Sequence, residues 1–423
     1  MAGTARPVST RRTLQILGPG LITGASDDDP SGIATYSQVG AQFGFGLCWV
    51  MLFSFPLMTA IQETCARIGR ATGEGIAGNI RRHYPLWLLR VIVTLLLIAN
   101  IINLGADLGA MGSVVTMIAG GPALFYAVLF GALCAGLQIF TNYRRYVGIL
   151  KWIAVSLLAY VATALVIDIP WREVLLRTLI PSLQFDTKYI VAIVAVLGTT
   201  ISPYLFFWQS SQEAEDVRAD PKAKPLKRAP RQAPAEFRRI RIDTYLGMFV
   251  SNAIGWFIIV SVAATLNAHG VKDIQTASQA AEALRPIAGP FAFFLFALGI
   301  IGTGMLAVPV LAGSAAYALA EALRWSGGLA RRPKAAKAFY ATIALATGFG
   351  MIFNLLPIDP IKALFWTAVL NGVVAVPIMV MTMLMAGQKR VMGNFVLPRS
   401  LAVMGWIATA VMCAVAVALI VTW

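Results

Sequence analysis

The sequence predicts an all-α polytopic membrane protein with about eleven transmembrane helices, built from two inverted five-helix repeats and one further helix. The first observation is composition, because 58% of the 423 residues are hydrophobic and only 13% are charged, which departs from soluble globular proteins on both counts. The second is a series of about eleven apolar stretches of roughly 20 residues, each long enough to cross a hydrocarbon core about 30 Å thick. The third is that two of these stretches are interrupted by polar residues and a proline.

The first repeat is expected over residues 1–168, which include an N-terminal tail. Its helices are expected near residues 14–43, 47–68, 86–113, 122–140 and 147–168. The first helix is expected to break where three consecutive aspartates and a proline interrupt its apolar sequence.

The second repeat is expected over residues 188–386, and a final helix follows in residues 399–423. The helices are expected near residues 188–213, 243–267, 290–323, 337–356, 361–386 and 400–422. The sixth helix is expected to break at 199–203. The polar, proline-containing segment 213–239, within the basic stretch 213–241, predicts a solvated, mobile cytoplasmic linker.

The prolines of the two interrupted helices, Pro30 and Pro203, lie about 170 residues apart, which is the spacing expected of corresponding positions in two repeats. Because each repeat has five helices, an odd number, the two repeats have opposite orientations in the membrane. Interrupted helices at matching positions of inverted repeats indicate a substrate site near the bilayer midplane.

The net charge of +15 is a topology signal and does not indicate a nucleic-acid partner. Most of the 34 Lys and Arg residues fall in six regions, which lie on alternate sides of the predicted helices: Arg6 to Arg12, Arg67 to Arg90, Arg144 to Lys151, 218–241, 324–337 and 389–399. Since cytoplasmic loops carry excess Lys and Arg, the N-terminus is expected inside and the C-terminus outside.

Cysteine and histidine usage excludes a soft or imidazole-rich metal cage. The four cysteines occur singly without a CxxC pair, and both histidines lie in predicted loops: Cys48, Cys65, Cys134, Cys413, His83 and His269. No nucleophile–base constellation or cofactor motif is visible, so neither an enzyme nor a bound cofactor is expected.

The aspartates in GASDDDPSG, residues 24–32, are the strongest functional signal. A buried Asp near the membrane centre costs at least about 2.5 kcal/mol, and such residues usually line a pathway or bind a cation. Asp29 is therefore the expected cation ligand, beside backbone carbonyls that the helix breaks expose. Asp27 and Asp28 remain open between partners of Asp29, vestibule residues that face water, and protonated neighbours.

Three stretches carry a family resemblance: GPGLITGASDDDPSGIATYSQVGAQFGFGLCWV, LMTAIQETCARIGRATGEG and GTTISPYLFFWQS. They resemble the NRAMP divalent-metal transporters, whose first helix opens with GPG, carries an Asp-Pro-Gly-Asn element and leads into a GAQFG turn. The resemblance is strong over residues 18–75 and moderate around the sixth helix. It implies a fold like that of the bacterial leucine transporter, alternating access, and a bacterial inner membrane.

Carried over residue by residue, the resemblance places the family's metal-binding aspartate on Asp29 and its asparagine on Gly32, so that an amide ligand is missing. The position that supplies a backbone carbonyl in the sixth helix matches Thr199, and the family's methionine matches Ser202. The amide that the tenth helix contributes corresponds to Asn371 in a loose alignment.

These departures favour a harder ion. A thioether favours transition-metal ions, whereas carboxylate, hydroxyl, carbonyl and water oxygens suit Mg²⁺. With Ser202 and Gly32 at these positions the site is expected to be wide and lined by oxygen, as a partly hydrated Mg²⁺ requires. The pattern is similar to the NRAMP-related magnesium transporters, so Mg²⁺ is the expected substrate and Mn²⁺ a second one.

Proton coupling is not expected. In the family, coupling is associated with a histidine after the sixth-helix proline, which here is Tyr204, and with acidic residues on the third helix, of which Asp107 is kept and another appears as Ala110. A tyrosine hydroxyl keeps its proton at neutral pH and is a poor proton carrier. For Asp107, a structural hydrogen-bonded carboxylate and a functional one remain equally open.

Three alternatives remain. One is a proton-coupled Mn²⁺ or transition-metal transporter of the NRAMP type, and another is an ion-coupled symporter of a small organic solute on the same fold. The third is a metal-sensing membrane protein that signals through the segment 213–239. In all of these the bilayer is the surrounding medium, and oligomeric state stays open.

Overall fold

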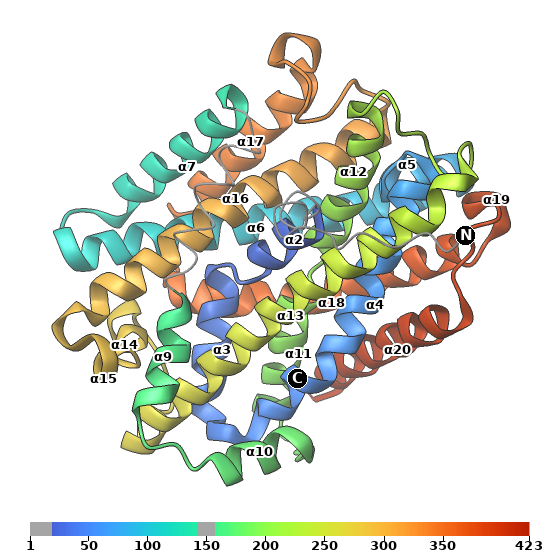
Figure 1. The fold of residues 1–423 in the computed structure, drawn as a ribbon. Helices are drawn as coiled ribbons and strands as arrows, with labels where there is room; N and C mark the ends of the chain where they lie inside the picture. Colours follow the sequence, from blue (N-terminus) through green and yellow to red (C-terminus); the bar gives the residue numbers. More distant parts are fainter. Residues whose placement is uncertain (1–18, 142–156, 423) are drawn as a thin grey trace, which may run out of the picture.

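The computed structural model describes residues 19–141 and 157–422, and the regular structure in these ranges is entirely helical (Figure 1). Within the described residues, 8 helical segments are long and apolar enough to cross a membrane, and Lys337–Phe353 is a shorter apolar helix. The all-α membrane class is therefore confirmed, while the number eleven stays a prediction. The expected helix starts at 14 and 147 and the basic residues Arg6 to Arg12 and Arg144 to Lys151 lie outside the described residues, so the membrane orientation also stays a prediction.

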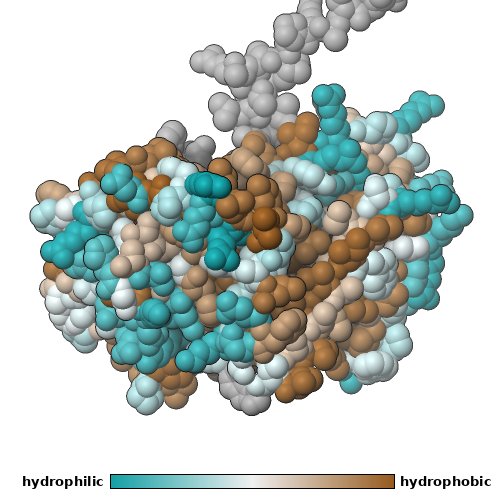
Figure 2. All heavy atoms as spheres, turned by 90° about the horizontal axis from the view of Figure 1, so that it is seen from below, coloured by the Kyte–Doolittle hydropathy of each residue, from teal (hydrophilic) through white to brown (hydrophobic). Residues whose placement is uncertain are grey.

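The long helices occupy the apolar stretches. They are α4 (Cys48–Thr72), α6 (Leu86–Ala119), α7 (Ala123–Phe140), α13 (Ala233–Thr265), α16 (Ala292–Leu323), α17 (Lys337–Phe353), α18 (Pro360–Ala386) and α20 (Arg399–Thr422). The helix α9 (Leu158–Val166) is the described part of the expected fifth helix. Many large apolar side chains on these helices are exposed, and Figure 2 shows bands of hydrophobic residues on the surface, as lipid contact requires.

The first and sixth helices are both broken where the sequence predicts. The first consists of α2 (Pro19–Asp27) and α3 (Pro30–Phe43), and the sixth consists of α11 (Thr187–Thr200) and α12 (Pro203–Ala219). Pro30 and Pro203 each open the second half of their helix, where a missing N–H costs nothing and the fixed φ suits the first turn. The residues before them, Asp29 and Ser202, are extended.

Helices of each expected repeat pack on helices of the other repeat. The half-helix α2 packs on α13, and α12 packs on α4, while α6 packs on α16. Two of these contacts depend on glycine. Where α2 meets α13, a Cβ on Gly24 would stand 2.4 Å from the backbone of Gly247, and where α4 meets α12, a Cβ on Gly69 would stand 2.0 Å from the carbonyl oxygen of Ser210. Small residues at these crossings let the broken helices lie directly against their partners. The repeat boundaries 1–168 and 188–386 stay predictions.

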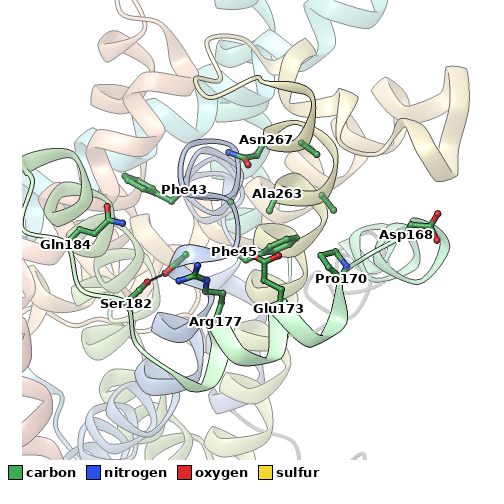
Figure 3. Close-up of a pocket in the computed structure, with 14 residues that line it drawn as sticks. Phe43, Phe45, Asp168, Pro170, Glu173, Arg177, Ser182, Gln184, Ala263 and Asn267 are labelled. Carbon is green, nitrogen blue, oxygen red and sulfur yellow. Dashed lines mark hydrogen bonds between the residues drawn. The ribbon is translucent and has the colours of Figure 1, made fainter.

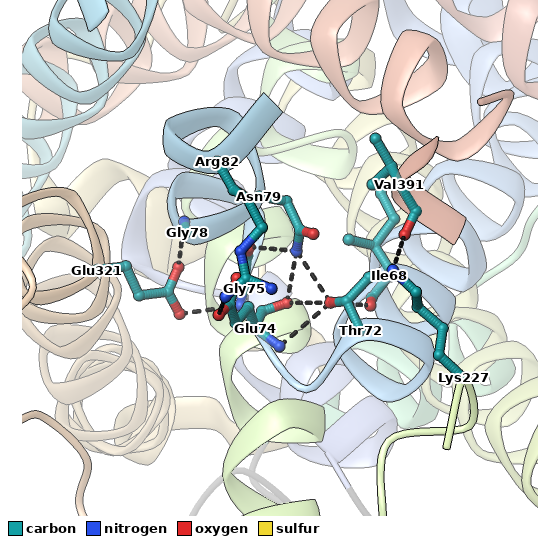
Figure 4. Close-up of polar contacts among 10 residues, drawn as sticks. All are labelled: Ile68, Thr72, Glu74, Gly75, Gly78, Asn79, Arg82, Lys227, Glu321 and Val391. Carbon is teal, nitrogen blue, oxygen red and sulfur yellow. Dashed lines mark hydrogen bonds and ion pairs between the residues drawn. The ribbon is translucent and has the colours of Figure 1, made fainter. Parts of the chain in front are cut away.

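The predicted linker over 213–239 is wrong in its extent, while most residues of the shorter connection are exposed, in agreement with a solvated segment. Helix α12 continues to Ala219 and α13 begins at Ala233, so that only the residues between them form a connection. Leu226 in that connection is fully buried, and its N–H donates to the carbonyl of Arg70 at 3.2 Å. The ammonium of Lys227 donates to the carbonyl of Val391 at 3.0 Å (Figure 4). Leu226 and Lys227 therefore anchor a largely exposed connection to the helix ends.

Two amphipathic helices that the sequence analysis did not predict lie between the long ones. They are α5 (Ile76–His83), which follows α4 and precedes α6 along the chain, and α10 (Trp171–Leu179), which follows α9 and precedes α11 (Figure 1). Shorter helical turns are α14 (Ala277–Glu282), α15 (Arg285–Ala288) and α19 (Lys389–Met392). A window of about 20 apolar residues misses such elements, because they are short and carry charged residues.

Candidate metal site between the helix breaks

The breaks of the first and sixth helices lie against each other. The hydroxyl of Tyr204 on α12 lies 2.9 Å from the carbonyl oxygen of Ser26 on α2 and 3.3 Å from Oδ2 of Asp29. A Cβ on Gly32 would stand 3.1 Å from Oγ1 of Thr199. Four of the predicted residues, Asp29, Gly32, Thr199 and Tyr204, are thus brought together, although the chain separates the two pairs widely.

Asp29 has two differently engaged oxygens. Its Oδ1 accepts from the N–H of Gly32 and from the hydroxyl of Ser31, both at 2.7 Å, and so caps the N-terminus of α3. Its Oδ2 accepts only longer bonds, from the amide of Asn103 at 3.2 Å and from the hydroxyl of Tyr204 at 3.3 Å. The cap orients the carboxylate, and Oδ2 is the oxygen that can bind a cation with least loss of existing bonds.

Asp27 and Asp28 point to a different partner. The hydroxyl of Ser251 on α13 donates to Oδ2 of Asp27 at 2.6 Å and also lies 3.2 Å from Oδ1 of Asp28. Asp27 is 0% exposed and Asp28 4% exposed, so neither faces solvent as a vestibule residue would. In the described part of the chain, no group of three or more His, Cys, Asp or Glu side chains is arranged to hold a metal. The three consecutive aspartates therefore do not form one carboxylate cage.

The end of α11 presents backbone oxygen at the break. In a continuous helix the carbonyl of Thr199 would accept from the N–H of residue 203, but that residue is Pro203 and has no N–H. The hydroxyl of Ser202 lies 2.8 Å from the carbonyl oxygens of both Gly198 and Thr199. Since this hydroxyl serves as a donor there, its lone pairs remain available to a cation.

Asn371 lies on α18, which packs tightly on α11. A Cβ on Gly198 would stand 2.5 Å from the backbone nitrogen of Gly372, so these two glycines let the helices touch. Thr199 and Asn371 are the sequence neighbours of this contact. Asn371 is 1% exposed, and its Nδ2 has no hydrogen-bond partner among the described residues. The structure records no hydrogen bond between Asn371 and Asp29 or Ser202 in that part of the chain.

Asn103 on α6, which was not predicted from the sequence, donates to Asp29. Asn103 is one of three buried polar residues on an otherwise apolar face: the amide of Asn100 donates to Oγ of Ser314 at 2.7 Å, and Asp107 is fully buried. The spacing of Asn100, Asn103 and Asp107, at i, i+3 and i+7, places them on one side of a helix. This stripe was a readable signal in NIINLGADLG. Ser251, the partner of Asp27, was also missed and had no comparable signal.

Several buried oxygens around the breaks have no hydrogen-bond partner among the described residues. They are Oγ of Ser26, Oδ1 of Asp27, Oδ1 of Asn103, and both oxygens of Asp107. A buried polar atom without a partner costs about 1–3 kcal/mol, so a concentration of them requires an explanation. Asp107 lies one turn of α6 beyond Asn103, which donates to Asp29, so it belongs to the same buried polar stripe of that helix. A cation among these oxygens would satisfy both the charge and the lone pairs.

A cavity of about 460 Å³ lies elsewhere, at the end of α3 (Figure 3). It is lined by the turn that contains Phe45, by Glu173 and Arg177 of α10, and by Asn267. Figure 3 shows side chains of both charge signs at its rim, and none of the predicted metal-site residues lines it. This cavity is therefore distinct from the site at the helix breaks.

Comparison with known proteins agrees with the geometry. A protein named divalent metal cation transporter MntH from Deinococcus radiodurans is 24% identical over 429 residues, which cover 98% of this chain and 91% of the relative. A protein of the same name from Klebsiella pneumoniae strain 342 is 26% identical over 406 residues, which cover 94% of this chain and 92% of the relative.

Solved structures show the same fold. The crystal structure of the Eremococcus coleocola manganese transporter with an aromatic bis-isothiourea compound superposes with a TM-score of 0.76 at 16% identity, covering 98% of this chain and 87% of that one. The structure of MhsT with L-phenylalanine superposes with a TM-score of 0.62 at 14% identity, covering 99% of this chain and 100% of that one. Residues 20–422 match the family described as Natural resistance-associated macrophage protein-like, Nramp, and the chain therefore belongs to the Nramp family.

Proposed function

We propose that this chain transports divalent metal cations across a bacterial inner membrane, with Mg²⁺ as the preferred cargo and Mn²⁺ as a second one. Family membership and the two relatives named divalent metal cation transporters support the cargo class. The observation that carries the proposal is Asp29, a buried carboxylate held by an N-terminal cap at the point where two broken helices meet. In this proposal the chain is a transporter and not an enzyme, and the metal is cargo and not a cofactor.

The proposed ligands are all oxygens. Oδ2 of Asp29 supplies the charge, and the carbonyl of Thr199 and the hydroxyl of Ser202 lie on the opposite break. Asn103 contributes through Oδ1, which has no partner among the described residues, once its amide turns away from the orientation in which Nδ2 donates to Asp29, and Asn371 remains a proposed ligand from α18. Mg²⁺ favours such oxygen ligands and keeps part of its water shell, so few protein ligands suffice.

Gly32 does not create open space in this conformation. A Cβ there would stand 3.1 Å from Oγ1 of Thr199 and 3.3 Å from the carbonyl of Asp27, closer than ordinary contact. The glycine instead lets the two breaks approach each other. The proposal of a wide site therefore rests on two points. Glycine stands where the resembled family has an asparagine side chain, and the breaks are proposed to separate in another conformation of the transport cycle.

Transport driven by the ion gradient and membrane potential is the proposed energy source. A divalent ion gains about 4.6 kcal/mol per 100 mV, from about 2.3 kcal/mol per charge. Tyr204 lies at the position of the family's histidine and hydrogen bonds to Asp29 and Ser26, so it orients the carboxylate. Pro30 and Pro203 maintain the breaks.

One observation favours the second candidate, a proton-coupled transporter of Mn²⁺ or transition metals. Asp107 is fully buried one turn of α6 beyond Asn103, the donor to Asp29, and neither of its oxygens has a hydrogen-bond partner among the described residues. Such a carboxylate is available to a proton as well as to the cargo. An Asp107→Asn variant separates the candidates: Mg²⁺ uptake without any internal acidification, in parent and variant alike, supports uncoupled transport.

The test is flux into proteoliposomes with a panel of divalent cations, read together with internal pH. Uptake of Mg²⁺ and Mn²⁺, each competing with the other and neither acidifying the interior, is expected. Mn²⁺ uptake with no Mg²⁺ uptake or competition would refute the proposed selectivity. Acidification that depends on the metal would establish the proton-coupled candidate instead.

A further inference from the structure

A groove of about 450 Å³ lies between α4, α13 and α20, away from both helix breaks. All three helices belong to segments that are long and apolar enough to cross a membrane. Large apolar side chains on the same helices are exposed, including Phe249 at 58% and Ile407 at 45%. A surface of this kind on a membrane-spanning helix faces lipid.

The lining of the groove is graded from polar to apolar along all three helices. The polar end consists of Glu63 on α4, Arg241 on α13 and Ser400 on α20. The apolar side chains one or two turns further along each helix are Phe55, Tyr245 and Met404. Two cross-helix contacts align the gradients: Glu63 approaches Arg241 at 3.7 Å, and the rings of Phe55 and Tyr245 lie 6.3 Å apart. The groove thus has the polarity of one leaflet, from headgroup to acyl chain.

The polar end carries an uncompensated positive charge. The carboxylate of Glu63 is neutralised by Arg67, whose Nε and Nη2 lie 2.8 Å and 2.7 Å from its Oε1. Arg241 reaches that carboxylate only at 3.7 Å, and its side chain is 60% exposed. The guanidinium of Arg241 is therefore only weakly paired within the protein and can bind an anionic group outside it.

The start of α20 adds to this potential. The groove is lined by Pro398, Ser400 and Leu401, which surround the first turn of this 24-residue helix. That turn contains no acidic residue, and the exposed Arg399 lies within it. A helix N-terminus carries partial positive charge and free N–H groups, so the polar end of the groove presents Arg241 beside a helix terminus.

We infer that this groove binds an anionic phospholipid. The phosphate and headgroup lie against Arg241 and the start of α20, and an acyl chain lies along Phe55, Tyr245 and Met404. Charge complementarity selects an anionic lipid over a zwitterionic one, because the negative charge of Glu63 is already paired and no other carboxylate among the described residues lines the groove for an ammonium group. Basic residues predict that this end of the molecule is cytoplasmic, where a basic pocket between helices is suited to anionic headgroups.

The test compares lipids retained by the full chain in native mass spectrometry after incubation with phosphatidylglycerol or phosphatidylcholine in detergent. The parent protein is expected to retain phosphatidylglycerol in preference. Arg241→Gln is expected to lower phosphatidylglycerol retention about fivefold, which corresponds to the roughly 1 kcal/mol that one arginine contributes at an anionic membrane surface. Met404→Trp, which fills the apolar part of the groove without changing charge, is expected to lower it as well.

The matched control is Arg332→Gln, which removes an exposed arginine that does not line the groove. This variant is expected to retain lipid like the parent, and Arg241→Lys is expected to restore most of the binding. Equal retention of the two lipids by the parent would overturn the inference, as would unchanged phosphatidylglycerol retention in Arg241→Gln. Because Arg241 is largely exposed, its substitution does not threaten folding, and an unchanged unfolding temperature in detergent verifies this.

Discussion

The helix breaks and the end of α4 are both buried and rich in polar residues, but they differ in how their carboxylates are satisfied. Glu321 of α16 accepts from the N–H groups of Gly75 and Gly78, both at 3.0 Å, and from the hydroxyl of Ser211 at 3.1 Å (Figure 4). Both of its oxygens are therefore engaged by the protein. At the breaks, Asp107 has no partner on either oxygen among the described residues, and Oδ2 of Asp29 accepts only long bonds.

This difference separates structural carboxylates from those available to cargo. Glu321 ties the start of α5 to α12 and α16, and Figure 4 shows its carboxylate directed at Gly75 and Gly78. Fully paired buried groups stabilise one arrangement, whereas unpaired ones carry a cost that an incoming cation removes.

The largest effect is expected for Asp29→Asn. An asparagine keeps the N-terminal cap of α3 but removes the charge, so folding is preserved while the ion loses its only charged ligand in the proposed set. Loss of one partner from a buried charge pair costs at least about 3 kcal/mol, which predicts a fall in Mg²⁺ and Mn²⁺ uptake of about 100-fold or more. Uptake is measured in proteoliposomes, and uptake equal to that of the parent would remove Asp29 from the site.

A different outcome is expected for Glu321→Gln. Its amide would present a donor to a backbone N–H, which leaves a buried pair unsatisfied and lowers stability by about 1–3 kcal/mol. The apparent KM for the metal should remain that of the parent, because Glu321 contacts no proposed ligand. Thermal unfolding in detergent measures the loss of stability.

The control for this variant is Glu282→Gln. Glu282 forms an exposed ion pair with Arg285 at 2.9 Å, and exposed pairs contribute at most about 1 kcal/mol. An equal effect of the two substitutions on the unfolding temperature would contradict a special role for the Glu321 contacts.

A smaller effect is expected for Gly32→Ala. A Cβ would stand 3.1 Å from Oγ1 of Thr199, so the two breaks must separate slightly, at a cost of about 1–3 kcal/mol for the conformation described. We expect uptake to fall several-fold with Mg²⁺ still preferred. Gly136→Ala is the control, since a Cβ there meets nothing within 4 Å. Uptake unchanged in Gly32→Ala would show that the contact of the breaks is unimportant for transport.

The smallest effect is expected for Met111→Leu. The sulfur of Met111 lies 2.5 Å from the point where a Cβ on Gly304 would stand, and Pro30 lies 3.3 Å from the same point, so a thioether packs beside the first break. If the cargo ligands are oxygens, this substitution should change the ratio of Mg²⁺ to Mn²⁺ uptake by less than about twofold. A selective loss of Mn²⁺ uptake would instead identify Met111 as a soft ligand.

Much of the fold could be predicted because membrane helices are specified locally. Long apolar runs locate them, and Pro30 and Pro203 mark the two breaks, since proline removes the N–H that a continuous helix needs. The identity of Asp29 as an N-terminal cap follows from the same local rule. These features depend on the nearest few residues.

The features that could not be predicted depend on tertiary partners. Helix α12 continues through Glu213 and Glu215 because Arg239 and Tyr317, which are distant in sequence, bond to them. The orientation of Asp27 and Asp28 depends on Ser251 of α13. The role of Asn103 depends on how α6 is rotated against the break, although its stripe of polar residues indicated the buried face.

The most direct test of the central claim is the position of Mn²⁺ in crystals of the protein, located by anomalous scattering. One strong peak is expected between the two breaks, within coordination distance of Oδ2 of Asp29 and facing the carbonyl of Thr199. This peak is expected to disappear in Asp29→Asn. A peak between Asp27, Asp28 and Ser251, or in the cavity at the end of α3, with none beside Asp29, would contradict this claim.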